Sequence, residues 1–445
     1  MPAESGYAAF LRDLPPDWPV APIAEVARVV GGGTPSRDVG PFWNGSIPWV
    51  TPGEISAETA VFLNETREHI SPAGLAGSGA TLLPAGSLMI TTRATLGARA
   101  INLVPMTTNQ GFKSLVFPDP EDSQFFYYLT EKLKPELKRR ASGTTFLEVS
   151  GGELARIRVP VPPKGERTQI AVVLDTLDTT IRQTEAIIEK LKQVKQGLLH
   201  DLLTRGIADN GELRPPQSEA PHLYKESALG WIPKAWDAMP MRAACSTITK
   251  GTTPAVDQMW QGDEGIRFLR VDNLSFDGRF DFAASNFRIS PDTHTHSLGR
   301  SRCYPGDVLT NIVGPPLGKL GLITSATGEV NINQAIALFR PSGVLLPAFV
   351  LLWLGSALAQ TWLRQRAKQT SGQVNLTLAL CQELPVLRMG LEGQQRVIDR
   401  TQAMQNRLTS EDDKLTKLLA LKTGLMDGLL TGRGRVTSLL LGAPA

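Results

Sequence analysis

Two distant stretches of the chain end in almost the same phrase. Residues 195–206 read KQGLLHDLLTRG and residues 422–433 read KTGLMDGLLTGR, so six of the twelve positions are identical. Lys195 and Lys422 are 227 residues apart, which is about half of the 445-residue chain. Self-similarity at half the chain length predicts an internal duplication, in which two copies of one architecture follow each other in the sequence.

Further landmarks recur in the same order at nearly the same separation. The separation rises from 218 to 229 residues along the chain, as expected if loops in the two copies differ in length. We therefore expect each half to hold a globular part followed by a long helix. The matched positions are Trp18 and Trp236, Thr34-Pro35 and Thr253-Pro254, Ile47 and Ile266, Pro84 and Pro305, Leu96-Gly97 and Leu317-Gly318, Asn109-Gln110 and Asn333-Gln334, and Ser142-Gly143 and Ser371-Gly372.

An apolar seam predicts the long helices. Seam positions recur at alternating steps of four and three from residue 170, which is the a/d pattern of a coiled coil, and adding 227 to each gives the second seam. Polar residues interrupt both seams at the same steps, at Thr184 and Glu411 and at Lys195 and Lys422. The other seam positions that we assign are Ile170, Leu174, Leu177, Ile181, Ile188, Leu191 and Leu198 in the first helix and Val397, Met404, Leu408, Leu415, Leu418 and Leu425 in the second.

The coincidence of these interruptions favours pairing of the two seams with each other. A four-helix arrangement, or pairing with a helix of a partner, is the alternative. A lysine in an apolar seam can fix the register of a helix pair or extend its amine outward to solvent. We expect Lys195 and Lys422 to fix the register.

The globular parts have the pattern of a mixed α/β fold. Short apolar runs bounded by turn residues predict strands at 87–91, 114–117 and 307–313. Helical spacing predicts helices at 122–140 and 347–366. The segment IADNGELRPPQSEAPH at 207–222 predicts an exposed linker because it is rich in proline and polar residues, and a flexible tail is expected from Gly434 onward.

Composition sets few limits on function. The net charge of +3 neither demands nor excludes a nucleic-acid partner, and Cys245, Cys303 and Cys381 share no spacing typical of disulfides or zinc. Residues 1–14 carry charges where a signal peptide needs an apolar stretch. The uncharged run at 344–359 is shorter than the roughly 20 residues of a spanning helix. We expect a cytoplasmic protein without a membrane segment.

Motifs for catalysis are missing from the sequence. GPPLGKL at 314–320 is one residue shorter than a phosphate-binding loop and lacks its hydroxyl, so it predicts a tight turn before a strand. His294 and His296 could hold a metal, but no third ligand lies nearby in the sequence and exposed loop histidines are the expectation. We expect neither catalytic residues nor a metal site.

Two matched segments carry a family resemblance. YKESALGWIPKAWD at 224–237 and its shorter counterpart LRDLPPDWPV at 11–20 resemble the openings of target-recognition domains. With GGGTPS at 31–36, the NQ pairs, and helices ending in LLTRG and LLTGR, the chain resembles the specificity subunit of type I restriction-modification systems over nearly its whole length. The first opening lacks the Tyr-Lys and Gly-x-Ile-Pro elements of the second.

The resemblance implies a fold with an internal pseudo-two-fold repeat. Two mixed α/β (α+β) target-recognition domains would stand in tandem, separated by two long antiparallel coiled-coil helices. The implied division is 1–165 for the first domain, 166–206 for the first spacer helix, 207–225 for the linker, 226–390 for the second domain, 391–433 for the second spacer helix and 434–445 for the tail.

The resemblance also implies a non-catalytic subunit that binds a bipartite, asymmetric target in double-stranded DNA. Two modification subunits would methylate adenine and restriction subunits would cut. No cofactor is expected on this chain, whereas S-adenosylmethionine, ATP and magnesium are expected on the partner subunits. The alternative is a coiled-coil scaffold or protein-interaction adaptor without DNA specificity.

Candidates for DNA contact lie in turns that differ between the two halves. Arg, Asn and Gln suit base edges, whereas Lys, Ser and Thr suit phosphates. Residues that repeat, among them Trp43, Trp49, Trp236 and the two NQ pairs, are expected to be scaffold. The candidates are Ser36, Arg37, Asn44, Thr92 and Arg93 in the first half and Lys250, Thr252, Arg270, Asn273 and Asn311 in the second.

Overall fold

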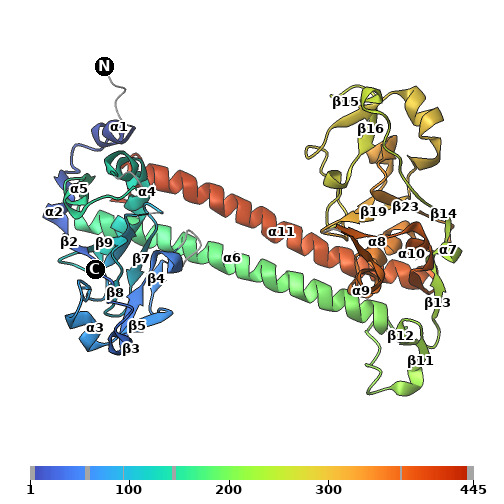
Figure 1. The fold of residues 1–445 in the computed structure, drawn as a ribbon, viewed down its shortest axis with the longest axis horizontal. Coiled ribbons are helices and arrows are strands. Elements are labelled where there is room, and N and C mark those ends of the chain that lie inside the picture. Colours follow the sequence, from blue (N-terminus) through green and yellow to red (C-terminus); the bar gives the residue numbers. More distant parts are fainter. Residues whose placement is uncertain (1–5, 56–60, 94, 143–146, 371–372, 438–445) are drawn as a thin grey trace. The chain divides into compact units, whose positions relative to one another are not determined.

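The chain folds into two compact units. The computed structural model describes residues 6–55, 61–93, 95–142, 147–370 and 373–437. The first unit comprises residues 1–185 with 413–445, and the second comprises residues 186–412. Each unit combines one globular part with one segment of each long helix, α6 (Lys164–Thr204) and α11 (Leu391–Leu430) (Figure 1). Of the Ser-Gly landmarks, Gly143, Ser371 and Gly372 lie outside the described residues.

The first unit is built on a five-stranded sheet in the order β2-β9-β6-β7-β4. All four residues of β6 are buried, because this central strand is short, apolar and covered on both faces. A second sheet has the order β5-β3-β8, and β1 pairs with β10. The strands are β1 (Val20–Pro22), β2 (Arg28–Gly31), β3 (Trp43–Val50), β4 (Phe62–Leu63), β5 (Glu68–Ile70), β6 (Leu88–Thr91), β7 (Arg99–Asn102), β8 (Thr107–Thr108), β9 (Phe112–Val116) and β10 (Arg158–Pro160).

The second unit repeats this topology. Its four-stranded sheet has the order β14-β23-β19-β21, in which every neighbouring pair is antiparallel, as in β2-β9-β6-β7. In its five-stranded sheet β16 lies between antiparallel β17 and parallel β22, just as β3 lies between antiparallel β5 and parallel β8. Since the strand orders and directions agree, the matched landmarks of the sequence belong to matched elements.

The remaining strands of the second unit form small sheets. β13 pairs with β26, β11 with β12, and β20 with β25, which also pairs with β24. The strands are β11 (Tyr224–Ser227), β12 (Gly230–Pro233), β13 (Asp237–Pro240), β14 (Cys245–Lys250), β15 (Met259–Gln261), β16 (Ile266–Leu269), β17 (Phe287–Ile289), β18 (Arg302–Cys303), β19 (Val308–Asn311), β20 (Val313–Gly314), β21 (Leu320–Leu322), β22 (Val330–Ile332), β23 (Ile336–Pro341), β24 (Lys368–Thr370), β25 (Gln373–Asn375) and β26 (Pro385–Arg388).

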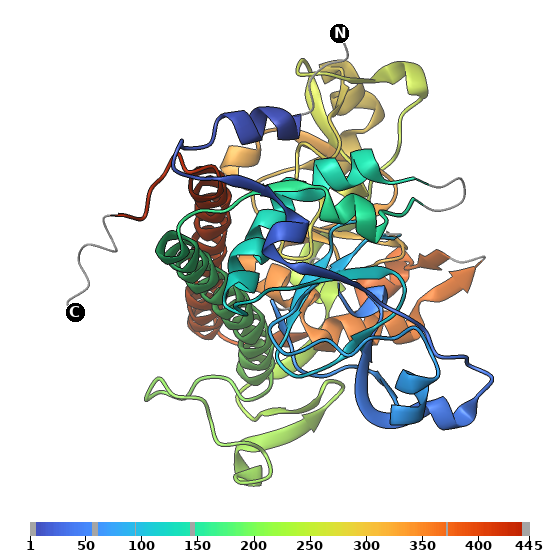
Figure 2. The same ribbon diagram turned by 90° about the vertical axis from the view of Figure 1, so that its left-hand side faces the viewer.

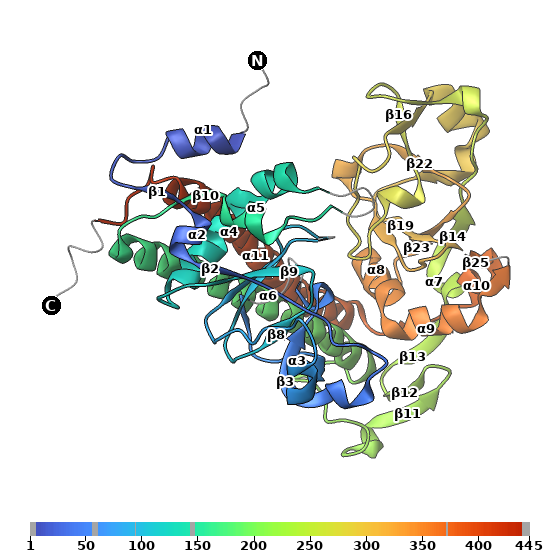
Figure 3. The same cartoon turned by 60° about the vertical axis from the view of Figure 1, so that its left-hand side comes forward.

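Helices cover one face of each main sheet. In the second unit α8 packs on β19 and β21 (Figure 3). The helices of the globular parts are α1 (Gly6–Arg12), α2 (Ile23–Val26), α3 (Pro72–Ala76), α4 (Asp122–Arg140), α5 (Gly151–Ala155), α7 (Met241–Ala244), α8 (Pro347–Gly355), α9 (Ala357–Arg366) and α10 (Leu378–Glu383).

The predicted elements of the globular parts are largely confirmed. The strands predicted at 87–91, 114–117 and 307–313 correspond to β6, β9 and β19, and the helix predicted at 122–140 is α4. The single helix predicted at 347–366 is instead two helices, α8 and α9. Ser356 interrupts it with an extended backbone, and its hydroxyl accepts a hydrogen bond from the Ala359 amide to cap α9.

Segments of α6 and α11 lie side by side within each unit (Figure 2). In the first unit Ile170 and Leu174 share one apolar cluster with Leu425 and Leu429. In the second unit Leu198 and Leu202 share another with Val397 and Ile398. Positions 170, 174, 177, 181, 188 and 191 of the predicted seam are all buried, as are 397 and 408, because they face the other helix or the globular part.

Both lysines of the seam contact the opposite helix. Lys422 forms an ion pair of 2.6 Å with Asp178 within the first unit, and Lys195 donates to the Gln405 side chain at 2.5 Å within the second. Asp178 and Gln405 are themselves 227 residues apart, so the two polar contacts are equivalent under the repeat. Each pairs an early position of one helix with a late position of the other, so the segments run antiparallel in each unit.

The segments after the long helices are more ordered than the sequence suggests. The predicted exposed linker packs on the second unit, where Ile207 bridges to Leu213 and Ala220 and Tyr224 are buried. The tail predicted to be flexible from Gly434 is anchored at its beginning, because Arg435 pairs with Glu166 at 2.8 Å and with Asp17 at 2.6 Å. Residues 438–445 lie outside the described residues.

Removal of the carboxylate in the seam is expected to destabilise the first unit. In an Asp178→Ala variant the Lys422 amine loses its ion pair and the buried Tyr128 hydroxyl loses its acceptor. We expect the free energy of unfolding to fall by about 2 kcal/mol, since buried polar groups would lack partners. Thermal unfolding measures the change. Glu189→Ala, which removes an exposed ion pair of α6, is the control and should shift the midpoint little; equal shifts would contradict a role for the seam contact.

Candidate nucleic-acid interface

A loop with a repeated scaffold opens the candidate site of each unit. In the first unit the Thr34 hydroxyl donates to the Gln110 side chain, and in the second the Thr253 hydroxyl donates to the Gln334 side chain. These contacts explain why the Thr-Pro and Asn-Gln pairs recur together in the sequence. They support the expectation that the NQ pairs are scaffold.

A glycine brings the two sides of this scaffold together. A Cβ atom added to Gly32 would lie 1.9 Å from the Asn109 carbonyl oxygen, and one added to Gly251 would lie 1.9 Å from the Ile332 carbonyl oxygen. Only a residue without a side chain permits such a close backbone approach. The sequence signal GGG at 31–33 therefore reflects packing at Gly32 and not a cofactor loop.

Three candidates of the first unit lie at the solvent-facing rim of this scaffold. Ser36 and Arg37 are exposed in the loop after Pro35, and Asn44 is exposed with a left-handed backbone (φ 58°) where β3 bulges. Arg37 pairs with Glu68, and this hydrogen bond holds the pKa of the Glu68 carboxyl below its ordinary value. Arg93 is half-buried, and its backbone bridges to that of Glu148.

The second unit places its candidates at the equivalent rim. Lys250 is exposed at the end of β14, directly before the close glycine. The Thr252 hydroxyl accepts a hydrogen bond of 2.8 Å from Arg300. Arg270 is half-buried, with its guanidinium carbon 5.0 Å from the centre of the Phe287 ring.

Three candidates are corrected, because their side chains are buried and already paired. The Thr92 hydroxyl donates to the Gly111 carbonyl. Asn273 binds the Arg270 amide and two carbonyls, which matches the capping role of Glu54 in the first unit. Asn311 accepts from two amides across the turn that leads to β21. The sequence could not show this, since asparagine suits both a base edge and an internal turn.

Sequence reasoning missed two residues at these rims. Arg300 was not a candidate, although it contacts Thr252. Glu68 was not a candidate either, because it lies 31 residues from the arginine that it holds. No local motif marks either residue, and only the pairing of distant strands brings them to the loop.

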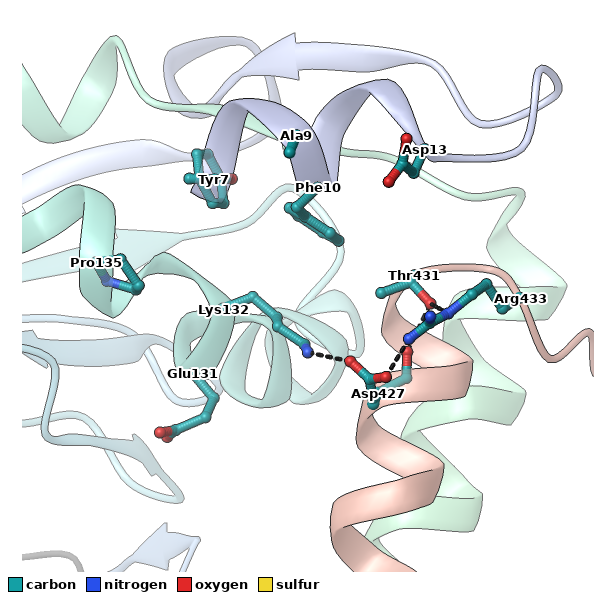
Figure 4. A pocket seen from close by; sticks show the side chains of 10 residues that line it. All are labelled: Tyr7, Ala9, Phe10, Asp13, Glu131, Lys132, Pro135, Asp427, Thr431 and Arg433. Atoms are coloured by element: carbon teal, nitrogen blue, oxygen red, sulfur yellow. Dashed lines mark hydrogen bonds and ion pairs between the residues drawn. The ribbon is translucent and has the colours of Figure 1, made fainter. Parts of the chain in front are cut away.

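A pocket of about 390 Å³ lies in the first unit away from these rims (Figure 4). Tyr7 and Phe10 of α1 line one side, and Lys132 of α4 faces the end of α11 on the other. Asp427 accepts from Lys132 at 2.7 Å and also pairs with Arg433. Because these charges are already paired with each other, the pocket chiefly fastens α11 to the globular part.

Metal and membrane sites were tested in the same coordinates. Among the described residues no cluster of three or more His, Cys, Asp or Glu side chains could hold a metal ion. His294 is buried beside Asn331, contrary to the expected exposed loop, and burial lowers the pKa of its imidazole. The helices in the described part of the chain include none with the length and apolar character needed to cross a bilayer.

Comparisons with known proteins point to one family. The family model described as "Type I restriction modification DNA specificity domain" matches residues 15–193. The specificity subunit of the type I restriction enzyme MjaVIII of Methanocaldococcus jannaschii is 22% identical over 438 residues, which cover 96% of this chain and 95% of the relative. The specificity subunit of the enzyme MjaIX of the same organism is 28% identical over 263 residues, so the match spans only 59% of either protein.

A solved structure has the same fold. The type I restriction-modification S subunit from M. genitalium superposes with a TM-score of 0.54 at 15% identity, covering 93% of this chain and 96% of that chain. At this identity the likeness concerns the fold. It agrees with the mixed helix and strand architecture of the described residues.

The close glycines provide a test of the repeated scaffold. Gly32→Ala and Gly251→Ala should each lower the free energy of unfolding by about 3 kcal/mol, because the new methyl group would overlap backbone oxygen atoms. Gly31→Ala is the matched control, since a Cβ there meets nothing within 4 Å. Urea unfolding of the three variants measures the difference. Similar stability of Gly31→Ala and Gly32→Ala would contradict the close approach.

Proposed function

Because the chain belongs to the specificity subunits of type I restriction-modification systems, we propose that it selects the DNA target of such a complex. One observation carries the proposal beyond the family name. The two units repeat a strand topology and a loop scaffold, yet the exposed residues at the rims of that scaffold differ. Two similar readers with unlike rims suit a bipartite and asymmetric target.

The spacer is the second part of the proposal. Residues 1–165 and 226–390 would form the two target-recognition domains, and α6 and α11 would form an antiparallel coiled coil that sets the distance between the two half-sites. The matched contacts Lys422–Asp178 and Lys195–Gln405 support one register for both helices. A helix of 40 residues is roughly 60 Å long, which exceeds one turn of DNA.

The exposed and half-buried candidates would contact DNA. In the first domain these are Ser36, Arg37, Asn44 and Arg93, and in the second Lys250, Thr252 and Arg270, joined by Arg300. Arginine and asparagine can read base edges, whereas lysine and hydroxyl groups hold phosphates. Thr92, Asn273 and Asn311 are left out because their polar groups are used within the fold.

The partners follow from the proposed role. Two modification subunits would bind this chain and methylate adenine with S-adenosylmethionine, and restriction subunits would use ATP and magnesium. This chain would bind no cofactor and perform no catalysis. A coiled-coil scaffold without DNA specificity is the alternative, and affinity for DNA that falls steeply with added salt would argue against it.

Methylation mapping tests the proposed selection. The purified chain with its modification subunits should methylate adenines within one split motif whose two halves differ. The chain without these subunits should methylate nothing. Sequencing that detects N6-methyladenine measures both results. Methylation at random sites, or at a single undivided motif, would contradict the proposal.

A paired deletion tests the spacer. Removing residues 182–188 of α6 and the facing residues 412–418 of α11 deletes one heptad from each helix and keeps both lysine contacts. The spacer shortens by about 10 Å at 1.5 Å per residue, so the gap in the motif should lose roughly three base pairs. Methylation mapping reads the gap. Deletion from α6 alone is the control and should abolish activity, whereas an unchanged gap in the paired deletion would refute the spacer role.

A further inference from the structure

The loop that carries Arg37 exists only in the first unit. Four residues, 36–39, separate Pro35 from the 3-10 turn Gly40–Phe42, whereas only Ala255 separates Pro254 from the equivalent turn Val256–Gln258. These turns are equivalent because the residue after each pairs with a matched isoleucine, Trp43 with Ile70 and Met259 with Ile289. Arg37 therefore lies in a three-residue insertion at a rim whose scaffold is otherwise repeated.

Three side chains hold the Arg37 guanidinium in one position. Its carbon lies 3.7 Å above the centre of the Trp43 ring and 5.3 Å from that of Trp49. Both guanidinium Nη atoms donate to the Glu68 carboxylate, with Nη2 at 3.0 Å from Oε2. Trp43 lies on β3 and Glu68 on the neighbouring β5, so paired strands fix the distance between the ring and the carboxylate.

The same tryptophans fix the loop itself. The Trp43 indole donates to the Ser36 carbonyl and the Trp49 indole donates to the Gly33 carbonyl, each at 2.9 Å. The arginine is thus held at its backbone and at its head group. Its side chain is nevertheless 55% exposed, so the held group faces solvent. A group fixed before binding loses less conformational entropy when it meets a ligand.

The remaining donors of Arg37 fit one kind of ligand. A guanidinium has five N–H donors, of which Glu68 takes one on each Nη atom, so three stay free, including that of Nε. Nε and one Nη form a fork that matches the O6 and N7 acceptors of guanine in the major groove. A phosphate could accept from the same fork, but it would not require an orientation fixed on three sides.

We propose that Arg37 reads a guanine in the half-site of the first domain, with Trp43 and Glu68 as positioning residues. This inference rests on the proposed DNA-selecting function and names the base that one residue of it reads. The second domain lacks the insertion, so its half-site has no counterpart of this contact.

Methylation of a duplex library with randomised half-sites tests the proposal. The full chain with its modification subunits is compared with an Arg37→Ala variant. The preference for guanine at one position of one half-site should fall roughly ten- to a hundred-fold, as expected for loss of a bidentate base contact. The preferences of the other half-site should stay unchanged, which shows within the same molecule that the variant folds and assembles.

Three further variants separate the roles of the residues. Arg37→Lys keeps the charge but loses the fork, so it should relax the same position, and Glu68→Gln should relax it less because the guanidinium is held more weakly. Arg156→Ala removes another exposed arginine paired with a glutamate of the first unit, and it should leave the motif unchanged.

Two results would overturn the inference alone. One is an unchanged motif in Arg37→Ala. The other is a uniform loss of methylation over all sequences that Arg37→Lys restores, which would mark a phosphate contact. If the unmutated complex shows no split motif, the proposed function fails and the inference fails with it, so the two failures are distinguishable.

Discussion

The pairing of α6 with α11 depends on two polar contacts in an apolar seam. Leucine and isoleucine side chains that repeat every seven residues pack almost equally well after a shift of one heptad, so they do not define a register by themselves. A buried amine without a partner is costly, and burial lowers the pKa of Lys195. The contacts of Lys422 with Asp178 and of Lys195 with Gln405 therefore favour one alignment. With that alignment Leu430 reaches the core of the first unit and Leu203 that of the second.

The duplication separates what must be kept from what can change. Gly32 and Gly251, the two Thr-Pro pairs and the two NQ pairs build the same loop scaffold, and steric exclusion at the glycines leaves little freedom. The rims beyond the scaffold face solvent and carry no such constraint. An insertion of three residues places an arginine on a tryptophan in one unit, and the other unit does without it. A reader of this design can change its target without rebuilding its core.

Local periodicity made part of this fold predictable. The bounds of α4 and of the two long helices follow from spacing and seam, and β6, β9 and β19 follow from short apolar runs. The break at Ser356 was missed because the apolar pattern continues across it and only the local cap reveals it. Asn273 and Asn311 were misplaced because a polar residue in a turn can face solvent or close the turn. Glu68 could not be found, since a salt bridge between distant strands has no signature in the sequence.

The first unit is discontinuous in sequence, and this has a consequence for synthesis. Its core includes Leu429, Leu430 and Val436, and the ion pairs of Arg435 join it late, whereas the second unit ends at residue 412. A ribosome thus releases every residue of the second unit before it supplies the segment that closes the first. The usual order, in which the N-terminal domain folds first, is reversed here. During translation the earlier-made domain waits with an open apolar face, and a chaperone that shields such faces has its substrate there.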